Sequence, residues 1–194
     1  MNNKSSTGAN MAQTALILID VQQGFDHPKW GQRNNPAAEQ YMAALLQHWR
    51  EQELPVIHVR HQSQEPDSPL RAGQEGFEFK ALARPLPGEA IFTKKVNSGF
   101  IGTELEAWLQ AKGIKQLVIA GLTTDHCVST TTRMAGNLGF SVELVADACA
   151  TFDRPGVNGE LIPADEIHRI HLASLHNEFC VVKNTADVIA AHTK

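Results

Sequence analysis

The sequence has little of what marks nucleic-acid-binding, membrane-spanning or disulfide-stabilised proteins. Its 17 Lys and Arg residues are outnumbered by 21 Asp and Glu, for a net charge of −4, so the basic excess that phosphate binding requires is missing. No apolar run approaches the roughly 20 residues that span a bilayer. Only three cysteines occur, Cys127, Cys149 and Cys180, without CxxC spacing, which favours a reduced, cytoplasmic compartment. We therefore expect neither a nucleic acid nor a membrane as a partner.

An export signal and a nucleotide-binding loop are also missing. The first 13 residues are polar, and the apolar stretch that follows, residues 15–19, is shorter than the roughly 7–15 residues of a signal peptide core. We interpret residues 1–13 as a disordered tail and residues 14–194 as a single domain. The turn after residue 19 reads DVQQG rather than GxGxxG, and no P-loop pattern occurs, which argues against a nucleotide-dependent oxidoreductase.

The chain alternates instead between two hydrophobic periods. Short continuous apolar runs predict buried strands, and apolar residues spaced three and four apart predict helices between them. Alternating strands and helices indicate parallel pairing with right-handed crossovers. We therefore predict a three-layer α/β/α sandwich, Rossmann-like, with a mainly parallel sheet of about six strands. The predicted strands are residues 15–19, 55–59, 89–93, 116–120, 142–145 and 179–182.

Helix signals are clearest between these strands. One apolar stripe runs from Met42 to Trp49, and another from Ile101 to Leu109, with Thr103 in capping-box spacing to Glu106. A third helix is expected at residues 126–138. Pro163 is expected to open a fourth helix, and residues 187–191 to form a short last one. The inward-facing side chains of the fourth helix should be Ile167, Ile170 and Leu175.

Residues 61–88 interrupt this alternation of strand and helix patterns. The segment is long, rich in Pro and Gly, and poor in periodicity. A long segment of this kind inside a compact domain is typically functional, so we expect it to help select a ligand.

Reactive side chains follow three of the predicted strands. Ligands of open parallel sheets bind beyond the carboxyl ends of the strands, where Asp20, Cys127 and the pair Lys94 and Lys95 fall. Cys127 should lie in the first turn of a helix, whose dipole and free N–H groups favour a thiolate and an oxyanion. The alternative is that Cys127 is an ordinary small buried residue. The residues alone also leave open which lysine points inward.

Three segments together resemble the isochorismatase-like cysteine hydrolases. Residues 20–25 (DVQQGF) look like the opening motif of that family, and residues 94–100 (KKVNSGF) look like its lysine segment. Residues 121–128 (GLTTDHCV) are similar to its nucleophile turn. The resemblance runs from about residue 15 to the C-terminus, and the spacing to the aromatic residue of the lysine segment identifies Lys94 as the family's lysine.

The resemblance implies a cofactor-free hydrolase that cleaves the C–N bond of a small-molecule amide or ureido substrate. In this family an Asp–Lys–Cys triad acts through a thioester. Cys127 would be the nucleophile, Asp20 the acid and base, and Lys94 the group that stabilises the thiolate. The oxyanion would lie against the backbone N–H groups of Cys127 and Thr123, with a cis peptide bond joining Leu122 to Thr123. The family also implies a homo-oligomer, either a dimer or a tetramer.

The substrate pocket and the absence of a metal are predicted from the same comparison. Aromatic and imidazole rings beyond the strand ends would form the pocket walls, although each could equally belong to the core or an interface. Nicotinamidases of this family hold a metal through an Asp-x-His pair, which this sequence lacks. His58 and His61 lie three apart on a strand and point to opposite faces, so we predict no catalytic metal. The predicted wall residues are Phe25, Trp30, His61 and Phe100.

Two alternative functions stay open at this point. True isochorismatases split a vinyl ether with an acidic residue and do not need a thiol, so the presence of Cys127 favours an amidase. The other alternative is a non-catalytic small-molecule-binding protein of the same fold. The presence of all three triad residues in the family's order argues against it.

Overall fold

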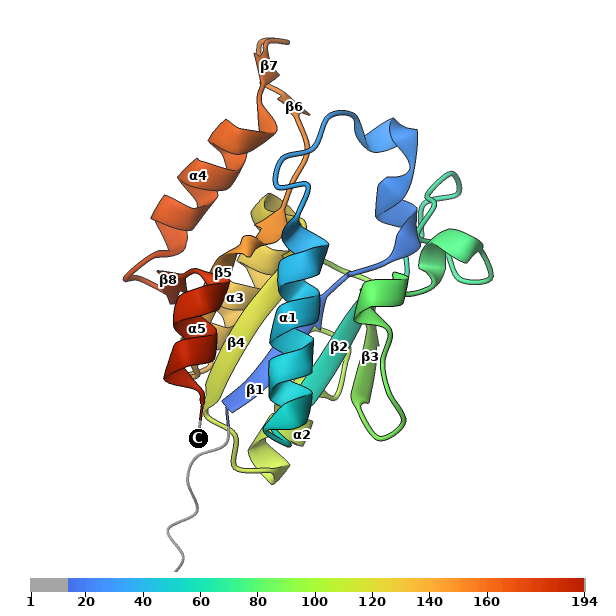
Figure 1. Ribbon diagram of the computed structural model, residues 1–194. Helices are drawn as coiled ribbons and strands as arrows, with labels where there is room; N and C mark the ends of the chain where they lie inside the picture. The colour runs from blue at the N-terminus through green and yellow to red at the C-terminus, as the bar shows by residue number, and fades with distance from the viewer. Residues whose placement is uncertain (1–13, 194) are drawn as a thin grey trace, which may run out of the picture.

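The structure, a computed structural model, describes residues 14–193 and contains a six-stranded sheet (Figure 1). The strands pair in parallel in the order β3-β2-β1-β4-β5-β8. The predicted α/β sandwich with a parallel sheet of about six strands is therefore confirmed. The predicted tail, residues 1–13, lies outside the described residues. The strands are β1 (Thr14–Ile19), β2 (Val56–His61), β3 (Ala90–Lys94), β4 (Gln116–Leu122), β5 (Ser141–Ala150) and β8 (Val181–Lys183).

Helices cover both faces of this sheet. In Figure 1, α1 (Ala38–Glu51) and α5 (Thr185–Ala191) lie on the face turned to the viewer, and α2 (Leu105–Ala111) and α3 (Ser129–Asn137) lie behind it. The remaining helix, α4 (Ala164–Leu175), flanks the edge strand β8. Among the helices of residues 14–193, none has both the length and the apolar character that crossing a membrane would require.

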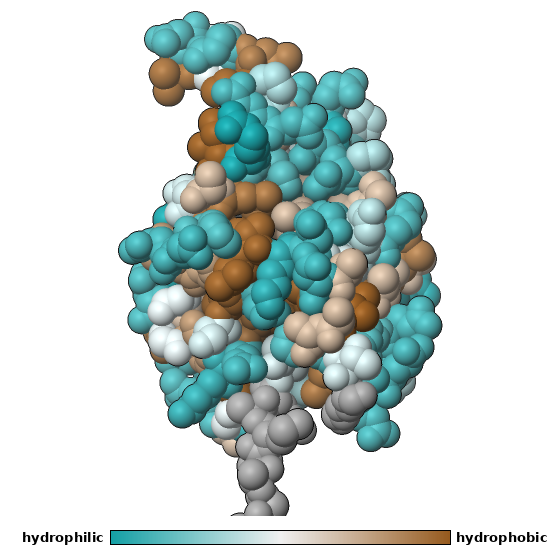
Figure 2. All heavy atoms as spheres, turned by 60° about the vertical axis from the view of Figure 1, so that its left-hand side comes forward, coloured by the Kyte–Doolittle hydropathy of each residue, from teal (hydrophilic) through white to brown (hydrophobic). Residues whose placement is uncertain are grey.

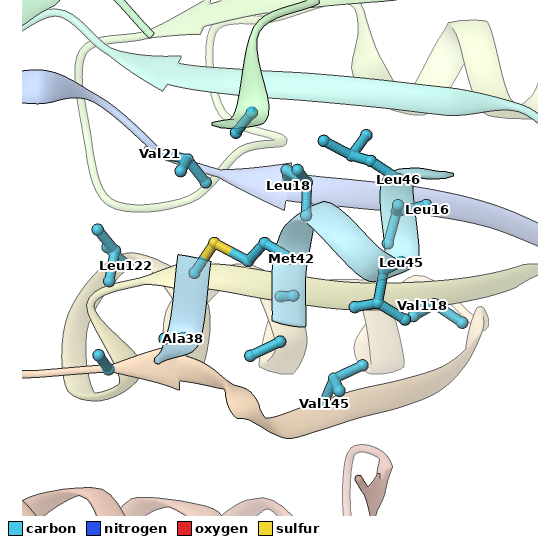
Figure 3. Close-up of a cluster of buried hydrophobic side chains, with 14 of the residues drawn as sticks. Leu16, Leu18, Val21, Ala38, Met42, Leu45, Leu46, Val118, Leu122 and Val145 are labelled. Atoms are coloured by element: carbon cyan, nitrogen blue, oxygen red, sulfur yellow. The ribbon is translucent and has the colours of Figure 1, made fainter. Parts of the chain in front are cut away.

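Strand β1 is buried on both faces, which explains its uninterrupted apolar sequence. Leu16 and Leu18 point towards α1, where they pack with Met42 (Figure 3). Ile17 and Ile19 belong to the second core cluster, on the face covered by α2 and α3. Burial of each side chain of this size contributes roughly 1.5–3 kcal/mol to the stability of the fold. The position of β1, and of the residue that follows it, is therefore well fixed.

A small hairpin projects beyond the sheet. Strands β6 (Arg154–Pro155) and β7 (Leu161–Ile162) pair in antiparallel fashion and lie at the end of α4, away from the main body (Figure 1). The side of the molecule that carries α4 and α5 has an apolar patch surrounded by polar side chains (Figure 2). Exposed apolar patches are typical of interaction surfaces, but the predicted homo-oligomer stays a prediction. Large apolar side chains exposed on the hairpin, α4 and β8 are Val157, Leu161, Ile170 and Val181.

Two helix predictions were wrong in detail. Helix α2 begins at Leu105, and Ile101 lies outside it with half of its surface exposed, because Gly102 interrupts the chain with a φ of +69°. The predicted capping box is only half formed: Thr103 Oγ1 accepts the amide of Leu105 at 3.4 Å, but Glu106 accepts from Gln110 at 2.8 Å rather than from Thr103. In α4, Ile170 is 48% exposed rather than inward-facing.

The segment between β2 and β3 contains only two short 3-10 turns, at Glu75–Phe77 and Ala81–Ala83. It packs back on the start of the chain, where the amide of Gln23 donates to the carbonyl of Glu78 at 2.9 Å. The side chain of Gln22 donates to the carbonyl of Phe77 at 3.0 Å. The segment therefore lies against the turn that follows β1, close to the carboxyl edge of the sheet.

Candidate active site

Asp20, Lys94 and Cys127 are distant in sequence and meet at the carboxyl edge of the sheet. The Nζ atom of Lys94 lies 2.7 Å from Asp20 Oδ2 and 3.2 Å from Cys127 Sγ. Asp20 and Lys94 are fully buried, and Cys127 is 8% exposed. The three side chains that the sequence singled out thus form one buried cluster.

Each of these side chains extends from the end of a different strand. Asp20 directly follows β1 with a φ of +53°, and its amide donates to the carbonyl of Val59 in β2 at 2.8 Å. Lys94 is the last residue of β3. Cys127 lies in a π-helical turn, Thr124–Val128, between β4 and α3. Because these strands run parallel on either side of β1, their carboxyl ends converge at one edge.

Strand β4 approaches β1 very closely at Gly121. This residue pairs with Ile19 and has a φ of +137°. A Cβ atom at this position would lie 2.1 Å from the carbonyl oxygen of Ile19, so no larger residue fits without a backbone shift. The close approach brings the turn that carries Cys127 towards the residue just before Asp20.

Burial and one ion pair set the charges of the cluster. Burial raises the pKa of the Cys127 thiol above its ordinary value, the charge of Asp20 raises it further, and Lys94 only partly opposes both. Burial alone would lower the pKa of Lys94, but the charges of Asp20 and Cys127 outweigh it, and the pKa is raised. Burial and Asp20 thus oppose ionisation of the thiol, whereas Lys94 favours it. The expectation that the helix terminus favours a thiolate at Cys127 stays a prediction, and burial acts against it.

Asp20 has one carboxylate oxygen engaged and one free. Oδ2 accepts a hydrogen bond from Lys94, whereas Oδ1 is buried without a hydrogen-bond partner. A carboxylate oxygen of Asp20 and the sulfur of Cys127 lie within 4.8 Å of each other. The cluster thus contains an unengaged proton acceptor next to the thiol, at a cost in desolvation that a purely structural ion pair would avoid.

Two more polar side chains touch the cluster. His61 Nδ1 lies 3.1 Å from Lys94 Nζ, and Asn97 Oδ1 lies 3.9 Å from Cys127 Sγ. The sequence had indicated His61 as a pocket wall but had assigned no role to Asn97. The only signal for Asn97 was its place in the segment that begins with Lys94.

Polar contacts anchor the turn that carries the cysteine. Asp125 accepts hydrogen bonds from Thr151 at 2.5 Å and from Arg154 Nε at 2.9 Å. Burial alone would raise the pKa of Asp125, but these two partners lower it to about 2. On the side of α4, His168 Nδ1 lies 2.8 Å from Thr124 Oγ1. The turn is therefore held by the residue that follows β5, by the projecting hairpin and by α4.

The peptide bond between Leu122 and Thr123 is cis. The carbonyl of Thr123 accepts the amides of His126 and Val128, each at 3.2 Å. These bonds fix the backbone that leads from β4 into the turn of Cys127. Oxyanion binding by the amides of Thr123 and Cys127 stays a prediction.

The four predicted wall residues lie in three different settings. The rings of Phe25 and Trp30 have centroids 5.3 Å apart, and Trp30 Nε1 donates to the carbonyl of Gly24 at 2.7 Å. Phe100 stacks on Phe140, 5.9 Å away, in the core cluster on the α2 side. Of the four, His61 is the one with a polar contact to the reactive cluster. The wall roles of the other three stay predictions.

The donor atoms of Asp20, His61 and Cys127 lie within 4.8 Å of one another, a spacing compatible with metal binding. The ammonium of Lys94, however, lies within 3.2 Å of a donor atom of each of these three residues. The positively charged ammonium therefore lies among these donor atoms, where it would repel a metal ion. We therefore interpret this donor set as the hydrogen-bond acceptors of Lys94 rather than as ligands.

The parallel sheet and the position of the reactive cluster define the class of protein. It is a three-layer α/β protein, and such proteins bind ligands beyond the carboxyl ends of their strands. Residues 14–187 match the family model of the isochorismatase domain. The uncharacterized isochorismatase family protein YrdC of Bacillus subtilis is 48% identical over 90% of this chain and 94% of its own length. The chain belongs to the isochorismatase family, a family of hydrolases.

Two further comparisons agree with this assignment. The crystal structure of a putative hydrolase of the isochorismatase family from Chromobacterium violaceum superposes with a TM-score of 0.90, at 50% identity and 94% coverage of both chains. Streptothricin hydrolase of Streptomyces noursei is 30% identical over 90% of this chain and 63% of its own length. The relatives of this chain thus include a protein that is named as a hydrolase.

Proposed function

We propose that this protein is a cysteine hydrolase that cleaves a C–N bond of a small amide or ureido compound through a thioester. The observation that carries the proposal is that the ammonium of Lys94 contacts Asp20 and Cys127 at once, in a buried cluster. Ion pairs with no chemical role are seldom fully buried against a thiol, because burial of the charges is costly. Perturbed groups gathered at one site are typical of catalysis.

In the first half of the reaction, the free oxygen of Asp20 takes the thiol proton of Cys127. The thiolate attacks the carbonyl carbon of the substrate, and the new oxyanion binds to the backbone N–H groups of Thr123 and Cys127. The ammonium of Lys94 stabilises the sulfur while it is negative. Asp20 then passes the proton to the departing nitrogen, the C–N bond breaks, and the acyl group stays on sulfur as a thioester.

In the second half, water replaces the amine. Asp20 takes a proton from the water molecule, whose oxygen attacks the thioester carbonyl. The C–S bond breaks, the acid is released, and the proton returns to the sulfur of Cys127. Throughout the cycle Lys94 keeps its charge, in agreement with its raised pKa. No step requires a cofactor.

The choice of bond is supported by the thiol. Vinyl ether cleavage needs only an acidic group. In such a reaction the contact between Cys127 and Lys94 would have no catalytic role. A screen of small amides and ureido compounds for ammonia release tests the proposal. Turnover should vanish in Cys127→Ala protein that retains the wild-type circular dichroism spectrum. Full activity in that variant would overturn the proposal and would favour acid catalysis by Asp20 alone.

A further inference from the structure

The ammonium of Lys94 has three N–H groups and three acceptors at hydrogen-bond distance. Two of them, Asp20 Oδ2 at 2.7 Å and Cys127 Sγ at 3.2 Å, belong to the proposed triad. The third is His61 Nδ1, at 3.1 Å. Because an ammonium only donates, this contact requires a lone pair on His61 Nδ1.

His61 is itself held in place by the backbone. It pairs directly with Lys94 in the register of β2 and β3, so their side chains leave the sheet on the same face. The side-chain amide of Gln22 accepts from the amide of His61 at 2.8 Å and donates to its carbonyl at 3.0 Å. The backbone of Val96 is also a hydrogen-bond partner of the ring and raises the pKa of His61. With Nδ1 as the acceptor of Lys94, the proton of a neutral ring lies on Nε2.

We infer that His61 is a positioning residue, a neutral Nε2-protonated imidazole that binds the third N–H of Lys94 and so orients the ammonium towards sulfur and carboxylate. The inference rests on the proposed function for its catalytic meaning, but the hydrogen bond and the tautomer can be tested without a substrate. An imidazole is suited to this task, because its lone pair has a fixed direction and carries no charge.

The surroundings of the ring agree with a neutral imidazole. Among the described residues, the charged groups that face it are Lys94 from β3 and Asp20 from the end of β1. Burial lowers the pKa of His61, the charge of Lys94 lowers it further, and Asp20 only partly opposes these effects. Protonation of His61 in acid would remove the acceptor and place a second cation against Lys94.

The tautomer can be measured directly. Long-range ¹H–¹⁵N spectra of the ¹⁵N-labelled wild-type protein at pH 7.5 should show His61 with an unprotonated Nδ1 and a protonated Nε2. Lys94→Met should raise the pKa of His61, whereas Lys95→Met, which removes an exposed neighbouring charge, should leave it unchanged. A protonated Nδ1 in wild-type protein would overturn the inference, even if Lys94→Met failed to fold.

The kinetics of two His61 variants distinguish a positioning role from a purely structural one. His61→Asn keeps an acceptor at the δ1 position and should retain kcat within about threefold, whereas His61→Leu should lower kcat about 10- to 100-fold with little change in KM. The acid limb of the pH profile should begin at lower pH in His61→Asn than in wild type. His27→Asn is the matched control, since His27 Nδ1 accepts only the exposed amide of Lys29.

Equal kcat values and pH profiles in wild type, His61→Asn and His61→Leu would contradict the positioning role. Loss of the nucleophile would give a different result: Cys127→Ala should abolish turnover and leave the His61 tautomer unchanged. Failure of the proposed function would appear as an active Cys127→Ala protein. The two outcomes are therefore distinguishable in one set of variants.

Discussion

Asp20 receives the ammonium of Lys94 on one carboxylate oxygen, at 2.7 Å, and keeps the other oxygen buried without a partner. One oxygen thus keeps the lysine in place while the other is available for a proton. In the proposed mechanism, this division would let a single carboxylate belong to an ion pair and also act as acid and base.

Loss of the nucleophile should be close to complete. Cys127→Ser should lower kcat/KM by at least about 10³-fold, because a serine hydroxyl is a much poorer nucleophile without a base matched to it. Ammonia release from the substrate found by screening gives the rate. As a control, Cys180→Ser should stay active, since the Cys180 side chain donates to the carbonyl of Leu175 and lies outside the cluster. Comparable activity of Cys127→Ser and wild type would rule out the thioester.

The charges around the sulfur can be tested by alkylation of Cys127 with iodoacetamide across pH. The charge of Asp20 raises the pKa of Cys127, so Asp20→Asn should move the alkylation midpoint to lower pH, by about one unit or more. The charge of Lys94 lowers the same pKa, so Lys94→Met should move the midpoint to higher pH. Labelling is followed by mass spectrometry of the Cys127 peptide, and thermal melts identify variants that unfold. Shifts in the same direction for both variants would contradict the ion-pair arrangement.

Gly121 should be nearly irreplaceable. Gly121→Ala should destabilise the protein by at least about 3 kcal/mol, because the added Cβ would meet the carbonyl oxygen of Ile19 at 2.1 Å. Gly139→Ala is the control: its φ is also positive, at +88°, but nothing lies within 4 Å of the added atom, so a cost of about 1 kcal/mol is expected. Urea denaturation measures both values. Equal costs would show that backbone conformation, and not the close approach of β4 to β1, determines the requirement.

Asp125 should make stability depend on pH in acid. Its pKa is lowered from 3.8 to about 2, so its stabilising effect is complete above the unfolded-state value and is lost as pH falls through about 2. Asp125→Asn should therefore cost about 1–2 kcal/mol at pH 7, after allowance for solvent screening, and much less near pH 2. Urea denaturation at both pH values provides the test. Asp67→Asn, at an exposed position, should show no such difference.

The sheet could be predicted from the sequence because its central strands are buried on both faces. The run at residues 15–19 has no polar residue, and in the structure every residue of β1 is buried. Strand β5 was predicted too short: it extends to Ala150, since polar Asp147 lies within it and interrupts the apolar pattern. Hairpin β6–β7 was missed, because its strands contain only two residues each.

The residues of the candidate site differed in how well the sequence predicted them. Asp20 could be found because a carboxylate ends an apolar run, whereas Lys94 needed the family resemblance to be told from Lys95. The structure shows why: Lys94 is fully buried and Lys95 is exposed, a difference that two adjacent identical residues do not reveal. The burial that raises the pKa of Cys127 could not be predicted from the sequence, because it depends on tertiary packing.

Two of the three contacts of Lys94 span 74 residues to Asp20 and 33 residues to Cys127. During synthesis, the carboxylate and the amine therefore leave the ribosome well before the sulfur does. Until β4 docks beside β1, the thiol stays in water with the chemistry of any unstructured cysteine. All three groups are present only once the chain has been synthesised beyond Cys127, so no N-terminal fragment that ends before Cys127 can possess the reactive centre.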